Sequence, residues 1–179
     1  MHNNDTNPLW AHNAGLIDAA ILLIGRLQRE AHPGFNYAQA VGPHLRHIIE
    51  HYTALLAALD SPSGLVDYDA RERDLALQSV PQVTLAKLTT LRTRFETLMH
   101  SHGPAASLAT SLTTRLQTGP AGELSIMSNT SLGRELCFLS SHTVHHFAVL
   151  VHLCHAAGVE LGHDFDKAPA TLAHERQAA

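Results

Sequence analysis

The chain has 179 residues, of which 45% are hydrophobic and 16% are charged, and its formal net charge is −4. This composition predicts one folded globular domain, residues 1–179, and excludes a disordered chain. With no basic surplus, the charge gives no reason to expect a nucleic-acid partner.

The chain start and its apolar runs predict a cytoplasmic protein with no membrane partner. The N-terminal segment MHNNDTNPLW is polar and lacks the pattern of a signal peptide. The longest apolar run, AAILLIG, is too short to span a bilayer. Cys137 and Cys154 fall on one predicted helix, roughly 25 Å apart, which is too far for a mutual disulfide. We therefore expect a reduced setting.

Two helices are predicted in the first third of the chain. Apolar residues at helical spacing predict the first helix over about residues 13–30, and Pro33 and Gly34 end it. The second begins in VGPHLRHIIEHYTALLAAL, with Pro43 in its first turn, and ends at DSPSG. We interpret the following LVDYDARERDLALQ as a loop that leads into the third helix.

The third helix is predicted to start at Ser79 as N-cap, with Gln82 completing a capping box, and to end near His100. After it, the alternating stretches SLTTRLQT and ELSIMS, joined by GPAG, predict a short β-hairpin. The last helix is expected over about residues 131–157, capped by Asn129 or Thr130. The tail, GHDFDKAPATLAHERQAA, is expected to be mostly irregular. Four such helices predict an all-α protein, a four-helix bundle with a short hairpin before the last long helix.

The histidines raise the question of a metal site. The stretch SHTVHHFAVLVHLCH holds five of them, yet with 15 histidines in the chain about one i,i+4 pair is expected by chance, and the sequence has two. His142 and His146 stand one turn apart on the same helix face and can reach one ion. A third ligand would come from another helix, and His44, His47 and His51 on the second helix are all candidates.

The stretches GPHLRHIIEHY, YDARERD and GRELCFLSSHTVHHFAVL together resemble the DinB superfamily, the DNA-damage-inducible and YfiT-like four-helix proteins. The tail segment DFDKAPAT is also similar to members of one bacterial branch. The resemblance implies a bundle of the DinB type, a homodimer, and a divalent metal held by one second-helix histidine and an HxxxH pair on the last long helix. On this chain those ligands are His47, His142 and His146.

The resemblance also implies a function. Characterised relatives include metal-dependent transferases and isomerases that use low-molecular-weight thiols, so we expect a thiol S-transferase acting on a small-molecule substrate. An imidazole-rich site suits zinc or nickel best, and also iron or copper. Two alternatives stay open: a hydrolase that uses metal-bound hydroxide, with Glu50 as its base, and a non-enzymatic helical module that binds metal or responds to stress.

Five further residues are expected beside the ligands or in contact with substrate: His44, His51, His145, Glu135 and Arg134. Glu135 lies two turns before His142 on the same face, where it either orients a ligand or is an ordinary buried carboxylate. Arg71 and Arg73 either bind an anionic substrate or pair at the surface with Asp69 or Asp74. No catalytic residue is assigned from the sequence.

Overall fold

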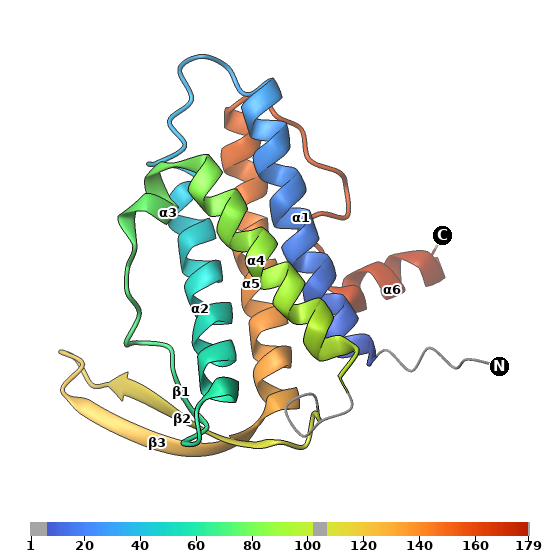
Figure 1. Ribbon diagram of the computed structural model, residues 1–179. Coiled ribbons are helices and arrows are strands. Elements are labelled where there is room, and N and C mark those ends of the chain that lie inside the picture. The colour runs from blue at the N-terminus through green and yellow to red at the C-terminus, as the bar shows by residue number, and fades with distance from the viewer. Residues whose placement is uncertain (1–6, 102–106, 179) are drawn as a thin grey trace.

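The protein is mostly helical and carries a small sheet (Figure 1). The computed structural model describes residues 7–101 and 107–178, so residues 1–6 of the polar N-terminal segment lie outside the described residues. Within those ranges the helices and strands, in chain order, are α1 (Pro8–Glu30), α2 (Gly42–Asp60), β1 (Leu65–Asp67), α3 (Leu75–Ser79), α4 (Pro81–Met99), β2 (Ser111–Thr118), β3 (Leu124–Ser131), α5 (Leu132–Ala156) and α6 (Pro169–Ala178).

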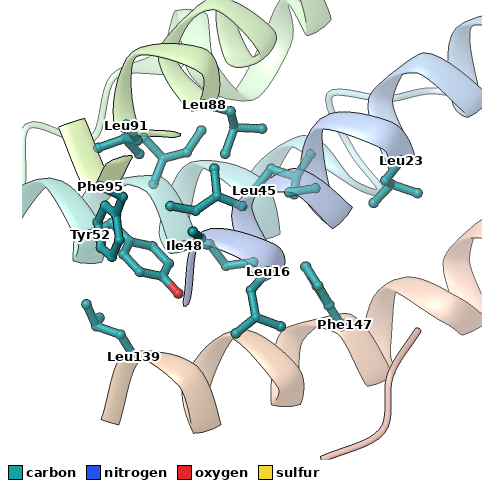
Figure 2. Close-up of a cluster of buried hydrophobic side chains, with 14 of the residues drawn as sticks. Leu16, Leu23, Leu45, Ile48, Tyr52, Leu88, Leu91, Phe95, Leu139 and Phe147 are labelled. Atoms are coloured by element: carbon teal, nitrogen blue, oxygen red, sulfur yellow. The ribbon is translucent and has the colours of Figure 1, made fainter. Parts of the chain in front are cut away.

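The four long helices pack on one another around a single apolar core. α1 contacts α4 and α5, and α2 contacts the same two helices. One cluster of buried apolar side chains extends along the chain from Trp10 to Val159. Figure 2 shows part of it, with side chains from all four long helices pointing toward one another. Removing this apolar surface from water is the main force that holds α2 against α5.

The ends of α1 and α5 differ slightly from the predicted ones. α1 begins at Pro8 because the side chain of Asn7 accepts a hydrogen bond from the Leu9 N–H at 3.0 Å, which caps the helix. α5 is capped by Ser131, whose hydroxyl accepts from the Arg134 N–H at 3.3 Å, so neither Asn129 nor Thr130 is its N-cap.

The predicted capping box at Ser79 is wrong. Ser79 is the last residue of α3, and α4 begins at Pro81 after Val80, which makes no side-chain cap. The cause is the short helix α3, which lies in the segment we interpreted as a loop. Asp74 caps α3 by accepting from the Ala76 N–H at 2.8 Å. The tail prediction is wrong as well, since α6 forms there.

The predicted hairpin is confirmed, and it belongs to a three-stranded sheet. β2 and β3 pair antiparallel from Ser111↔Ser131 to Thr118↔Leu124, and Gly119 and Gly122 take positive φ in the turn. β1 adds to β2 in parallel, a pairing that the sequence pattern did not predict. Figure 1 shows the hairpin extending sideways beyond the long helices.

α1 and α5 are each long and apolar enough to cross a membrane, judged by length and composition alone. A helix that lines the core of a folded protein passes the same test, and both helices contribute core residues here. The absence of a membrane partner and the cytoplasmic location therefore stay predictions.

A network of buried polar side chains forms hydrogen bonds between α1, α2 and α5. The Asn13 side chain is fully buried, and its amide donates to the carbonyls of Leu9 at 2.9 Å and Leu136 at 3.2 Å. Its oxygen accepts from the Tyr52 hydroxyl at 2.8 Å, and that hydroxyl in turn accepts from Thr143 at 3.4 Å. Burial raises the pKa of the Tyr52 phenol, so it stays protonated and able to donate.

We predict that Tyr52→Phe lowers the free energy of unfolding by about 1–3 kcal/mol, because it leaves the buried oxygen of Asn13 without a donor. Urea unfolding measures this change. The control Thr93→Val removes an exposed hydroxyl on α4 and is expected to change stability by less than about 0.5 kcal/mol. Equal effects of the two substitutions would contradict the prediction.

Candidate metal centre

The packing of α2 against α5 gathers histidines from both helices. His44, His47 and His51 come from α2, while His142 and His146 come from α5. The ring centroid of His47 lies 4.9 Å from those of both His142 and His146, and the latter two lie 4.7 Å from each other. The i,i+4 pair on α5 therefore faces a histidine of the neighbouring helix, as a shared site requires.

Three of these histidines can offer nitrogen atoms to one ion. Ligand atoms of His47, His142 and His146 all lie within 4.8 Å of one another, and the three side chains are partly buried. His142 Nε2 is buried and makes no hydrogen bond in the described part of the chain. A buried nitrogen without a partner is costly unless something else occupies its lone pair, which a metal ion would do. These are the three ligands that the resemblance implies.

His51 lies beside this group without joining it. Its Nδ1 donates to the backbone carbonyl of His47 at 2.8 Å, which fixes the proton on Nδ1. The ring centroid of His51 lies 4.2 Å from that of His47 and 4.6 Å from that of His142. The structure thus brings His51 against two of the three candidate ligands, as expected for a residue beside the site.

His44 and His145 occupy the rim. His44 Nδ1 and His146 Nδ1 are 3.0 Å apart and share one hydrogen bond, so His44 orients the ring of His146. His145 is exposed, and its ring centroid is 5.7 Å from that of His146. Of the three second-helix candidates, only His47 therefore belongs to the group that can share one ion.

Burial keeps the cluster neutral. Desolvation, followed by the like charges of neighbouring histidines, lowers the pKa of His47 to about 3 and that of His146 to about 4. Desolvation also lowers the pKa of His51 to about 4, and it lowers the pKa of His142 below its usual value. At neutral pH these rings are therefore uncharged, and the neutral imidazole is the form that binds a metal.

Arg71 connects this cluster to α2 and to the loop after β1. Its guanidinium, which can only donate, donates to Nδ1 of His47, and Nη1 lies 3.6 Å from Glu50 Oε2. It pairs with neither Asp69 nor Asp74, so the surface alternative for this arginine is wrong. Glu50 is itself buried and also lies 3.8 Å from Arg46.

Glu135 acts at one remove from the histidines. It is fully buried, accepts from the hydroxyl of Tyr68 at 2.7 Å and accepts from the hydroxyl of Thr130 at 2.6 Å. The ring of Tyr68 stacks on His51 at 5.1 Å. Burial, reinforced by the charge of Glu135, raises the pKa of Tyr68, so the phenol remains a donor. Glu135 thus holds Tyr68 and does not touch a candidate ligand directly.

Arg134 lies at the edge of the site with 65% of its side chain exposed. Its guanidinium lies 5.5 Å from the ring centroid of Phe138, and Phe138 stacks on His142 at 5.4 Å. Sequence reasoning assigned no role to Phe138 or Tyr68. Phe138 lies one helical turn before His142, and Tyr68 lies in the segment that follows β1. Neither position reveals from the sequence which way the aromatic ring points.

Comparison with protein-family models, with curated proteins and with solved structures finds no match for this chain.

The depressed histidine pKa values predict an acid-sensitive metal-free protein. The unfolded chain binds more protons than the folded one between pH 6.5 and about 3, so the free energy of unfolding falls as pH drops through this range. In chelator-treated protein we expect the melting temperature to fall by roughly 5–10 °C between pH 7 and pH 5.5. Differential scanning calorimetry measures it.

Two variants separate this cause from a general acid effect. His146→Gln, which removes one buried imidazole, is expected to flatten the pH dependence. His152→Gln, on an exposed position of the same helix, is expected to leave it unchanged. A melting temperature that is equal at both pH values in the parent would contradict the prediction.

Proposed function

We propose that this chain is a metal-dependent enzyme of the DinB superfamily whose long helices form a bundle of the DinB type. We propose that its reaction is the transfer of a low-molecular-weight thiol to a small electrophilic substrate. The observation that carries the proposal is the meeting of His47, His142 and His146, with ligand atoms within 4.8 Å of one another. A divalent ion, zinc or nickel before iron or copper, is the cofactor proposed for it.

The donor set fits such an ion. Burial lowers the pKa values of all three imidazoles, so at neutral pH the rings are uncharged and bind a metal without first losing a proton to the solvent. When bound, a divalent ion held by neutral imidazoles retains its full charge and lowers the pKa of a thiol or water beside it. His44 stabilises the ring orientation of His146 through the hydrogen bond between their Nδ1 atoms. The ring of His51 packs against that of His47, and its own hydrogen bond goes to the His47 backbone carbonyl.

One contact has to change when the ion binds. Nδ1 of His47 accepts from Arg71, so neither nitrogen of this ring serves as a ligand until the guanidinium withdraws. Glu50 provides the place for it: Oε2 is buried, makes no hydrogen bond within the described chain, and lies 3.6 Å from Arg71 Nη1. A charge-assisted pair with Glu50 would replace the contact with His47.

The hydrolytic alternative gains no support from these contacts. The three-histidine group contains no carboxylate, and Glu50 lies against Arg46 and Arg71. A thiol S-transferase needs no general base among the ligands, because a thiol is acidic enough for its proton to leave once its pKa is lowered.

We predict that protein purified without a histidine tag or a nickel column holds about one divalent ion per chain by elemental analysis. The double variant His142→Ala, His146→Ala is expected to hold none, since two of its three donors are gone. Zinc or nickel added to metal-free parent should raise its melting temperature, because the ion binds the folded state.

A matched double variant on the same helix, His152→Ala with His155→Ala, removes two exposed histidines and is expected to retain the ion. Circular dichroism establishes that both double variants fold. The metal-loaded parent should consume a small thiol in the presence of an alkylating electrophile. A metal-free parent that neither zinc nor nickel stabilises would end the proposal, whereas ester hydrolysis without thiol transfer would favour the hydrolase.

A further inference from the structure

A cavity of about 570 Å³ lies next to the candidate metal centre, between α2, α4 and the segment from β1 to α3. Arg71 and Glu50 belong to its lining, so it adjoins the histidine cluster through the same guanidinium that contacts His47. Its volume is that of a site for an organic molecule of moderate size. Most of its wall is apolar, and it is formed by Ile49, Ala54, Ala57, Leu65, Leu77, Val83 and Ala86.

Three polar groups of the lining can donate hydrogen bonds but have no acceptor among the residues that the structure describes. Arg71 Nε and Thr53 Oγ1 are buried and make no hydrogen bond within the described chain. Lys87, on α4, forms no ion pair with any described residue. Buried donors without acceptors are rare in folded proteins and call for a partner.

The acids around the cavity do not supply that partner. Asp67 is engaged by Arg115 and by backbone N–H groups, and Asp74 caps α3. Glu50 Oε1 accepts from the Asp74 N–H, and its Oε2, which has no hydrogen bond within the described chain, is the acceptor proposed above for Arg71 Nη1, so neither oxygen is left for Arg71 Nε, Thr53 or Lys87. Glu72 is exposed. The cavity therefore offers an apolar wall and unsatisfied donors, two of them on cationic side chains.

We propose that this cavity binds an organic carboxylate with an apolar body, whose oxygens accept from Arg71, Thr53 and Lys87. As the substrate site of the enzyme, the cavity rests on the proposed function, and Arg71 places the carboxylate end of the ligand beside the three-histidine group. The body of the ligand lies against the apolar wall. An amine of the same length would bring a cation against Arg71 and Lys87, which repel it and cannot accept a hydrogen bond from it.

Calorimetric titration of metal-free protein with octanoate tests the assignment. Octanoate is expected to bind at least about tenfold more tightly than octylamine, which has the wrong charge, and than acetate, which has no apolar body. Lys87→Met and Thr53→Val should each weaken octanoate binding severalfold. Arg29→Met, which removes an exposed cation on α1, should not change it.

Octylamine binding as tightly as octanoate, an unchanged affinity in both Lys87→Met and Thr53→Val, or no octanoate binding by the folded parent would each overturn the proposal. Elemental analysis of the parent as purified, before the metal is removed for the titration, keeps the two proposals apart. A parent that holds a metal ion but binds no octanoate defeats the carboxylate site alone. A parent that binds octanoate as expected but takes up no metal defeats the enzyme and leaves the carboxylate site standing.

Discussion

The packing of α2 against α5 is the constraint on which the candidate metal centre depends. Each helix by itself carries imidazoles that solvent would surround, and only the contact between the two helices brings His47 to His142 and His146. The apolar core behind them fixes that contact, together with the hydrogen bonds that join Asn13, Tyr52 and Thr143 across three helices. The geometry of the site is therefore stabilised by residues that never touch it.

Clustering the imidazoles raises the free energy of their charged forms and so favours the neutral rings. Partly buried imidazoles a few ångströms apart cannot all be charged, and burial alone already disfavours the charged form. The three candidate ligands include no carboxylate to offset this, so the rings stay neutral: His47 Nδ1 accepts from Arg71, and His142 Nε2 has no hydrogen-bond partner within the described residues. Such a set of donors is stable at neutral pH and suits a cation that needs no proton released.

Much of this site was predictable from the sequence, and the limits are physical. The pairing of His142 with His146 follows from helical spacing, and the hairpin follows from alternation around GPAG. The choice of His47 over His51 does not, because both lie near the same helix face, and only the packing of α2 on α5 decides which ring has a nitrogen within 4.8 Å of those of His142 and His146. The partner of Arg71 was equally hidden, since β1 and α3 set its position and neither was predicted.

Arg71 lies between the candidate metal centre and the cavity. Its guanidinium has Nδ1 of His47 on one side and Glu50 on another, while its Nε–H has no acceptor among the described residues. A single cation therefore lies between the place proposed for a divalent ion and the cavity proposed for a carboxylate. With a divalent ion at the histidines, the guanidinium of Arg71 would lie beside a second positive charge, and nearby anions would be needed to stabilise it. A ligand carboxylate and Glu50 together would therefore favour the position in which Arg71 no longer contacts His47. If both proposals hold, binding in the cavity and binding at the histidines would be coupled through one side chain, and such coupling is reciprocal.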